Sequence, residues 1–394
     1  MKDKLTKQIS ESTPPKAEGG KIFISAGEPS GDIHGSNLML EVLKREPGVE
    51  FYGLGRHRMV EAGLRCLHPM DNHSVMWAHI LGRIPTLWQI YQDCKEFFKA
   101  QRPSSVVLID YAGFNFYLAQ AASRLDIPVL YYISPQLWAH GAWRVKKLKR
   151  MVKKVLVIYP FEEDFYSRAG IPVRYVGHPL FDELAKRTIN TEMVHHLKEK
   201  GKNLISLLPG SREQEVAKLL PIFLKAAQAI QKKLPQSHFT ISCPHVKVMP
   251  MMESQLRQSG VSAEIVLGHL SELIEASDLC ITGSGTVTLE IAAHLRPMVI
   301  AYRITPFAYF VARPYMETPY LSLVNKMAES HLVPERLMYR DDYQWIADRA
   351  VELILDKDRR DFVVRGLEKV KGQIGIPGAS ARAAQEVLKM MKGK

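Results

Sequence analysis

Residues Ala26–Ser36 read A-G-E-P-S-G-D-I-H-G-S and connect the apolar run Ile22-Phe23-Ile24 to a segment of helical apolar spacing, 38–43. This order predicts a strand, a glycine-containing turn and a helix. Gly27 and Gly31 permit a tight turn and a close approach of the backbone to a ligand, and the unpaired N–H groups of the following helix suit an anion. The turn holds more polar side chains than a reversal of the chain requires, namely Glu28, Ser30, Asp32 and His34.

Similar apolar runs recur along the chain and alternate with segments of helical spacing. Continuous apolar runs are typical of strands that are buried on both faces of a parallel sheet. They fall into two series, so the sequence predicts an α/β protein with two doubly wound, Rossmann-like domains. The first series is 22–25, 51–53, 105–109, 129–133, 155–158 and 173–176, and the second is 204–208, 239–243, 264–267, 279–282 and 298–302.

The domain boundary is expected at Gly177-His178-Pro179, where a predicted strand ends and polar residues follow. Residues 1–20 are polar, lack an apolar core of a signal peptide, and are predicted to be a disordered tail. The first domain is then expected over 21–178 and the second over 179–370. A final helical segment, 371–394, could pack back on the first domain.

The overall composition is that of a soluble globular protein, with 46% apolar and 24% charged residues. The four cysteines form no C-x-x-C pair, which argues against a disulfide framework or a zinc knuckle and favours a reducing compartment. The formal net charge of +12 indicates an anionic partner, or simply a basic soluble protein. No nucleic-acid-binding motif is present, so a phosphorylated ligand or an acidic membrane surface is favoured over nucleic acid.

Ligands of doubly wound sheets bind beyond the carboxyl ends of the strands, so polar loops after predicted strands are candidate sites. Two such loops lie in the second domain. Gly210-Ser211-Arg212 opens a helix, and Arg212 could bind a phosphate through its guanidinium group, although an ordinary capped helix explains the same pattern. Gly283-Ser284-Gly285-Thr286 offers backbone N–H groups to a diphosphate. Glu290 follows one turn later and could accept hydrogen bonds from ribose hydroxyls.

Asp110 directly follows the apolar run 106–109, which places a carboxylate at the carboxyl edge of a buried strand. Such a group can serve as a general base. The alternative is a helix N-cap, a common role of aspartate.

Two segments could contact a membrane. Residues 77–91 are apolar at helical spacing but too short to span a bilayer, so they predict either an interfacial helix or a core-facing one. Arg144–Lys154 predicts a helix with a basic face for anionic headgroups or a phosphorylated ligand, or a merely solvated charged face. The membrane-contacting residues predicted in the first segment are Trp77, Ile80, Leu81, Ile84, Leu87 and Trp88.

The chain resembles lipid-A-disaccharide synthase, a glycosyltransferase family of lipopolysaccharide assembly in Gram-negative bacteria. The resemblance extends from about Lys21 almost to the C-terminus. It is carried by A-G-E-P-S-G-D at Ala26, I-D-Y-A-G-F-N at Ile109, S-P-Q-L-W-A at Ser134, G-H-P at Gly177, L-P-G-S-R at Leu208, G-S-G-T-V-T-L-E at Gly283, P-M-V-I-A-Y-R at Pro297 and L-S-L-V-N at Leu321.

The resemblance implies a glycosyltransferase B fold with two domains facing a cleft and no metal or other cofactor. It implies transfer of 2,3-diacylglucosamine from UDP to the 6-hydroxyl of 2,3-diacylglucosamine 1-phosphate, giving the β-1,6-linked disaccharide 1-phosphate and UDP, at the cytoplasmic face of the inner membrane. Asp110 matches the candidate base of the family, and Asn325 matches a position expected near the donor. The nucleotide is then assigned to the second domain, and the polar turn at 28–34 to the acylated sugars and the acceptor phosphate.

One departure concerns the base. The family often has a second aspartate three residues after the first, where this chain has Gly113, so catalysis should depend on Asp110 alone. Two alternatives remain: another UDP-sugar transferase or epimerase of the same fold, which would not need an interfacial helix, and a non-catalytic nucleotide- or lipid-binding paralogue, which retention of Asp110 disfavours.

Overall fold

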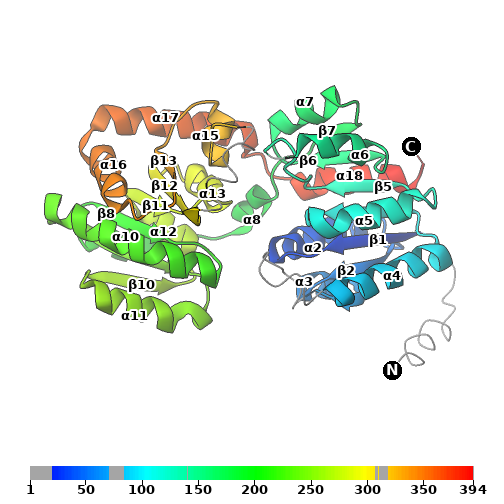
Figure 1. The fold of residues 1–394 in the computed structure, drawn as a ribbon, viewed down its shortest axis with the longest axis horizontal. Coiled ribbons are helices and arrows are strands. Elements are labelled where there is room, and N and C mark those ends of the chain that lie inside the picture. Colours follow the sequence, from blue (N-terminus) through cyan, green and yellow to red (C-terminus); the bar gives the residue numbers. More distant parts are fainter. Residues whose placement is uncertain (1–19, 71–83, 140, 307–308, 310–317, 394) are drawn as a thin grey trace. The chain divides into compact units, whose positions relative to one another are not determined.

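The computed structural model describes residues 20–70, 84–139, 141–306, 309 and 318–393. The chain divides into two compact units, shown in Figure 1. Unit 1 comprises Met1–Asp182 and Ile376–Lys394, and unit 2 comprises Glu183–Gly375. The chain therefore leaves unit 1 four residues after the boundary expected from the sequence and returns to it at Ile376. The predicted N-terminal tail, apart from Gly20, lies outside the described residues.

Unit 1 contains a seven-stranded parallel sheet in its described part, in the order β3-β2-β1-β4-β5-β6-β7. The central strands β1 and β4 are completely apolar at their centres, and their side chains are buried on both sides. The strands are β1 (Lys21–Ala26), β2 (Glu50–Gly55), β3 (Leu64–Pro69), β4 (Ser105–Ile109), β5 (Val129–Tyr132), β6 (Lys154–Val157) and β7 (Val173–Tyr175).

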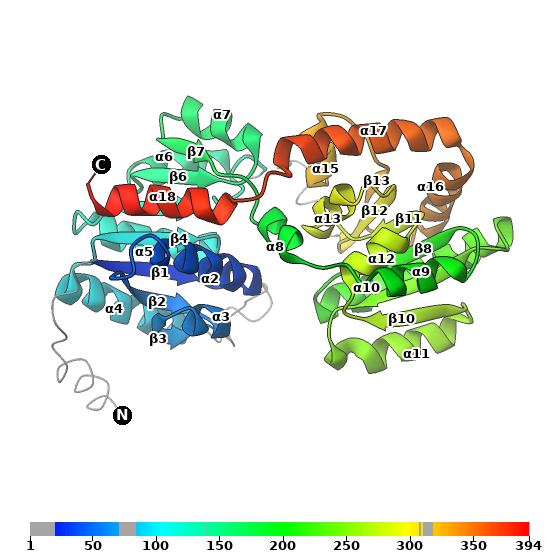
Figure 2. The same ribbon diagram turned by 180° about the vertical axis from the view of Figure 1, so that it is seen from behind.

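Helices cover both faces of this sheet. One face carries α4 (Ile84–Gln101), α5 (Ala112–Ser123), α6 (Val145–Lys149) and α7 (Pro160–Arg168), whose buried side chains belong to one apolar core with the strands. The other face carries α2 (Pro29–Leu43), α3 (His57–Glu61) and the C-terminal helix α18 (Ala379–Met391), and α18 packs against α2. Figures 1 and 2 show the two faces in turn.

Two buried carboxylates attach α18 to unit 1. Asp182, in α8 (Leu180–Lys186), accepts hydrogen bonds from the backbone N–H groups of Gly378, Ala379 and Ser380 and so caps the first turn of α18. Glu386 forms ion pairs with Lys154 and Arg174, at 2.6 and 2.7 Å. The last helix is therefore an integral part of the first unit.

Unit 2 contains a six-stranded parallel sheet in its described part, in the order β10-β9-β8-β11-β12-β13. Its strands are β8 (Leu204–Leu208), β9 (His238–Cys243), β10 (Ala263–Leu267), β11 (Leu279–Thr282), β12 (Met298–Arg303) and β13 (Glu335–Met338). Its helices are α9 (Thr191–Glu199), α10 (Glu213–Lys233), α11 (Met249–Ser259), α12 (Leu270–Ala276), α13 (Val287–Ala293), α15 (Leu323–Ala328), α16 (Tyr343–Leu355) and α17 (Lys357–Ile374).

The two sheets confirm the predicted pair of doubly wound domains, with two differences in detail. The sequence pattern did not indicate β3 and β13, which lie at the edges of their sheets and consist mostly of partly buried or exposed residues. The helix predicted over Arg144–Lys154 was also wrong in length, because α6 ends at Lys149. Beyond it, Lys153 donates its backbone N–H to Val129, and Lys154 begins β6 beside Leu130.

Candidate active site

In unit 1 the strand order reverses direction between β1 and β4, and this switch point is where doubly wound sheets bind ligands. Ala26 and Ile109 are paired at the carboxyl ends of these strands, so the loops that follow leave the sheet side by side. Gly27 packs directly against the ring of Tyr111, because a Cβ atom at Gly27 would lie 2.4 Å from that ring. The opening turn and the Asp110 loop therefore form one structure.

Asp110 is held in an unusual backbone conformation at this switch point. Asp110 and Tyr111 have φ angles of 46° and 47°, in the left-handed region that non-glycine residues seldom adopt. The carbonyl of Asp110 accepts hydrogen bonds from the Tyr131 hydroxyl (2.7 Å) and from Nδ2 of Asn115 (2.9 Å). Asn115 is fully buried, and its Oδ1 accepts a hydrogen bond from Ser25 of β1. These contacts fix the backbone from which the Asp110 carboxylate projects.

A second group of polar side chains lies at the ends of β6 and β7. His178 is buried, and its Nδ1 accepts a hydrogen bond from the backbone N–H of Leu180, which places the ring proton on Nε2, 3.3 Å from the Tyr159 hydroxyl. Burial, with a further contribution from His34, lowers the pKa of His178 to about 3. Burial raises the pKa of Tyr159 well above its usual value, and Glu162 and Asp110 add to this. His34, Asp110, Tyr159 and His178 are therefore electrostatic neighbours, and His178 is neutral at physiological pH.

The four polar residues predicted in the first turn have different positions in the structure. Glu28 immediately precedes α2, Ser30 is exposed in its first turn, and His34 is partly buried one turn later. Asp32 is buried, and its carboxylate accepts hydrogen bonds from the backbone N–H groups of residues 56, 58 and 59, at 2.9–3.2 Å. Asp32 thus caps the N-terminus of α3, a structural role that the sequence analysis did not predict.

Glu162 is a site residue that the sequence analysis did not identify. Its carboxylate is buried and accepts hydrogen bonds from Ser134 Oγ (3.2 Å), Trp138 Nε1 (3.0 Å) and the N–H groups of Ile158 and Tyr159 (3.3 Å each). It therefore connects the loop after β5 to the loop after β6. A glutamate at the third position of a helix is a common capping signal. The segment Y-P-F-E, residues 159–162, has this pattern and could have indicated the role of Glu162.

Glu162 is expected to make folding stability depend on pH. Burial raises its pKa from 4.5 to about 7, although its four donors oppose the shift. The folded protein keeps the Glu162 carboxyl group protonated up to about pH 7, whereas the unfolded chain loses this proton above about pH 4.5. The free energy of unfolding therefore falls by about 3 kcal/mol between pH 4.5 and 7. His178 contributes the opposite slope, because its folded pKa is depressed from 6.5 to about 3.

Urea unfolding of wild type and Glu162→Gln at the two ends of this pH range measures the Glu162 contribution. The wild type should lose stability relative to Glu162→Gln as the pH rises. Glu163→Gln is the control, since Glu163 is the adjacent residue and binds only the N–H of Tyr175 among the described hydrogen bonds. Parallel pH profiles of wild type and Glu162→Gln would contradict the prediction.

Unit 2 also has a switch point, between β8 and β11. Leu208 pairs with Thr282 at the carboxyl ends, and Gly283 donates its N–H to the Leu208 carbonyl, so the two predicted nucleotide loops lie side by side. Gly210 has a φ of +126°, and a Cβ atom there would lie 2.6 Å from Glu215 Oε2, so only glycine fits. In the second loop, Gly285 and Thr286 are exposed, and the Ser284 hydroxyl donates to the Leu321 carbonyl.

The first of these loops is closed by Glu215. Its Oε2 accepts hydrogen bonds from the backbone N–H groups of Ser211 and Arg212, and its Oε1 forms an ion pair with the Arg212 guanidinium at 3.1 Å. The backbone N–H groups at the start of α10 thus donate their hydrogen bonds to the Glu215 carboxylate. The arrangement is the helix cap that was the alternative interpretation, and the same N–H groups and guanidinium are of the kind that bind an oxyanion.

Glu290 is buried in α13 and belongs to a polar cluster. Its Oε1 accepts hydrogen bonds from Ser271 Oγ (2.7 Å) and from Arg187 Nη1 (2.9 Å). Arg187 also donates to Ser271 at 2.8 Å. Among the described residues nothing donates a hydrogen bond to Oε2 of Glu290. Ser271 and Arg187 had no signal in the sequence.

Asn325 is completely buried in α15. Its Nδ2 donates to the Val333 carbonyl, and its Oδ1 accepts from the Val333 N–H, both at 2.9 Å. Both ends of the amide are therefore occupied by the backbone of one residue. In this structure Asn325 ties α15 to the segment before β13.

The predicted membrane segment is only partly described. Trp77, Ile80 and Leu81 lie outside the described residues. Ile84 and Trp88 of α4 are 50% and 60% exposed, whereas Leu87 packs against the core of unit 1. In the described part of the chain, no helix is both long enough and apolar enough to cross a membrane. The same residues contain no cluster of three or more His, Cys, Asp or Glu side chains placed to hold a metal ion.

Comparison with solved structures defines the class of fold. UDP-GlcNAc 2-epimerase from Neisseria meningitidis, in a structure bound to UDP-GlcNAc, superposes with a TM-score of 0.64 at 14% identity, over 94% of this chain and 100% of that one. MurG from Acinetobacter baumannii superposes with a TM-score of 0.57 at 14% identity, over 95% and 100%. These similarities establish the glycosyltransferase B fold.

Sequence comparison is more specific. The family model of lipid-A-disaccharide synthetase matches residues 22–385. The lipid-A-disaccharide synthase of Geobacter sulfurreducens is 35% identical over 373 residues, covering 94% of this chain and 97% of the relative. That of Myxococcus xanthus is 34% identical with the same coverage. The chain therefore belongs to the lipid-A-disaccharide synthetase family and is a glycosyltransferase.

Proposed function

We propose that this protein transfers 2,3-diacylglucosamine from UDP to the 6-hydroxyl of 2,3-diacylglucosamine 1-phosphate, forming the β-1,6-linked disaccharide 1-phosphate and UDP. The names of its relatives support this reaction. The observation that carries the assignment of roles is the position of the two sets of loops. The Asp110 carboxylate lies on a firmly held backbone at the switch point of unit 1, and the loop at the switch point of unit 2 holds the Glu215 carboxylate on its backbone N–H groups.

Asp110 is the proposed general base. Its carboxylate takes the proton of the acceptor 6-hydroxyl while the oxygen attacks C1 of the donor sugar, and the bond from C1 to the UDP oxygen breaks with inversion. Tyr131 and Asn115 hold the Asp110 backbone, which keeps the carboxylate in one position. Gly113 occupies the place of the second aspartate of the family, so no neighbouring carboxylate in that motif shares the proton.

The loops of unit 2 are proposed to hold the UDP donor. The diphosphate gains negative charge as the bond to C1 breaks, and the N–H groups of Ser211 and Arg212 with the Arg212 guanidinium can stabilise it. The Gly283–Thr286 loop would add further N–H groups. Glu290 would accept ribose hydroxyls through Oε2, while Ser271 and Arg187 fix its orientation through Oε1.

In unit 1, the residue before α2 and the first two turns of α2 are proposed to bind the acylated acceptor. Glu28, Ser30 and His34 are the contacts, and Asp32 supports them by capping α3. We assign Asn325 a positioning role in unit 2, since both ends of its amide are occupied. The protein is proposed to attach peripherally to the anionic cytoplasmic face of the inner membrane, with Ile84 and Trp88 of α4 at the interface.

The direct test mixes purified protein with UDP-2,3-diacylglucosamine and 2,3-diacylglucosamine 1-phosphate in detergent micelles without metal. Disaccharide 1-phosphate and UDP are expected in equal amounts, followed by mass spectrometry and UDP release. UDP release without disaccharide, conversion of the donor to an epimer, or no turnover would each contradict the proposal. Replacing the lipid acceptor by unacylated glucosamine 1-phosphate should abolish the reaction, which separates this enzyme from transferases with soluble acceptors.

A further inference from the structure

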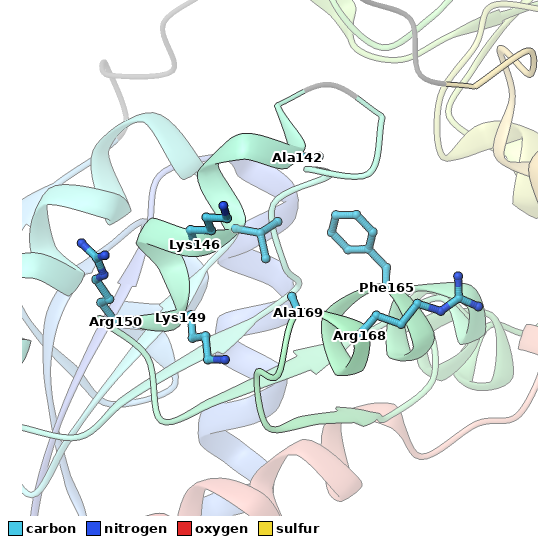
Figure 3. Close-up of a pocket in the computed structure, with 8 residues that line it drawn as sticks. Ala142, Lys146, Lys149, Arg150, Phe165, Arg168 and Ala169 are labelled. Carbon is cyan, nitrogen blue, oxygen red and sulfur yellow. The ribbon is translucent and has the colours of Figure 1, made fainter.

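A pocket of about 780 Å³ lies between α6 and α7 of unit 1. Figure 3 shows α6 on one side and α7 on the other, with the Phe165 ring extending from α7 toward α6. A volume of this size is typical of small-molecule sites. The pocket is lined by Ala142, Val145, Lys146, Lys149, Arg150, Phe165, Arg168 and Ala169.

The lining is amphipathic. Four of the eight residues are apolar, with Val145 buried and Phe165 packed partly on the core. The other four are cationic, and no acidic residue is present among the eight. Among the described residues, none of these four cations forms an ion pair, whereas Lys154 and Arg174 of the neighbouring strands β6 and β7 are both paired with Glu386. Four unpaired cations around an apolar base favour a ligand that has both an anionic group and an apolar part.

The pocket lies on the face of unit 1 that also displays aromatic side chains. Helices α4, α5, α6 and α7 cover the same face of the sheet, since they contribute to one core. Trp143, next to the lining residue Ala142, is 79% exposed. Trp88 of α4 and Tyr117 of α5 are 60% and 56% exposed, and both contact the ring of Tyr91. Trp and Tyr concentrate where proteins meet the headgroup region of a membrane.

We propose that this pocket binds the headgroup of an anionic membrane phospholipid. The phosphate would contact Lys146 and Lys149, and the glycerol and first acyl carbons would pack on Phe165 and Val145. A soluble polyanion such as nucleic acid would use the cations but leave the apolar base empty. The inference rests on the proposed peripheral attachment, and it adds to it a specific lipid site separate from α4.

The test measures co-sedimentation of the full chain with vesicles of three parts phosphatidylcholine to one part phosphatidylglycerol, and with pure phosphatidylcholine. Wild type should bind the phosphatidylglycerol vesicles selectively. Lys146→Gln/Lys149→Gln should weaken that binding by about 30-fold, since each cation at the surface contributes about 1 kcal/mol. Lys147→Gln/Lys153→Gln is the matched control, because both lysines are exposed in the same basic run and neither lines the pocket.

The control pair is expected to lose clearly less affinity than the pocket pair, because neither of its lysines lines the pocket. If both double variants lost vesicle binding equally, the binding would come from diffuse electrostatic attraction and not from the pocket. If neither lost vesicle binding, the proposal would be overturned. The transferase assay in detergent micelles provides the second measurement. An increase in the acceptor KM of the pocket variant there, with vesicle binding intact, would assign the pocket to the acceptor phosphate instead. Selective vesicle binding by a wild type without transferase activity would contradict the proposed function and leave the pocket standing.

Discussion

Asp110→Asn is expected to lower kcat by about 10²–10⁴-fold, the contribution usually made by one general base. Asparagine has the same shape and tolerates the left-handed conformation found at this position, so the backbone hydrogen bonds from Tyr131 and Asn115 should persist. The loss should therefore come from proton transfer and not from misfolding. Initial rates with saturating lipid substrates measure it, and the Kd for UDP should stay unchanged because the nucleotide loops belong to unit 2.

Asp126→Asn is the matched control for this experiment. Asp126 is also an aspartate with a positive φ, 57°, but it is exposed after α5, where the chain enters β5 at the opposite end of the sheet. Its replacement should leave kcat unchanged. An Asp110→Asn variant with full activity would eliminate Asp110 as the base, and a variant that fails to bind UDP would point to an effect on the whole fold.

Arg212→Ala is expected to lower kcat by about 10²–10³-fold. This is the usual effect of removing one group that stabilises the charge developing in a transition state. The kcat should fall more than the KM for the donor rises, because the UDP diphosphate gains charge as it leaves. Arg212 forms an ion pair with Glu215 that is largely exposed, with the Arg212 side chain 57% accessible. Such an exposed pair contributes only about 0–1 kcal/mol, so its loss on binding a diphosphate costs little.

Steady-state kinetics of Arg212→Ala, Arg212→Lys and Lys218→Ala test this role. Arg212→Lys keeps the charge but not the planar fork of the guanidinium group, so its activity should be intermediate. Lys218 is an exposed cation on the same helix, α10, and its removal controls for net charge. A normal kcat in Arg212→Ala, or an equal loss in Lys218→Ala, would remove Arg212 from charge stabilisation.

The strands and the loops at their carboxyl ends could be predicted from the sequence because both depend on local patterns. Buried parallel strands are continuous apolar runs, and β4 (105–109), β8 (204–208) and β11 (279–282) have the predicted limits. β3 (L-R-C-L-H-P) and β13 (E-R-L-M) contain no continuous apolar run and were missed for that reason, whereas the edge strands β7 and β10 were predicted.

The partners of the site residues could not be predicted, because they lie far away in the sequence. In the sequence, Asp32 has the features of a sugar-binding residue. Only the tertiary structure reveals that its carboxylate binds the backbone N–H groups of residues 56, 58 and 59. Glu290 has a recognisable position in its loop, but Arg187, its ion-pair partner, precedes it by 103 residues. The positions of the loops are thus visible in the local sequence, whereas the side chains in them that support the fold become evident only in the tertiary structure.

The return of α18 to unit 1 has a consequence for the order in which the protein matures. The ribosome completes unit 2, a continuous segment ending at Gly375, before it adds the helix that unit 1 needs. Until then the α2 surface covered by α18 is bare, and Asp182, Lys154 and Arg174 lack their partners in the last helix. Unit 1 therefore cannot complete its packing before the whole of unit 2 has been synthesised, although N-terminal domains usually fold first during synthesis. Loss of even the last nineteen residues would leave the half of the enzyme that carries Asp110 permanently unfinished.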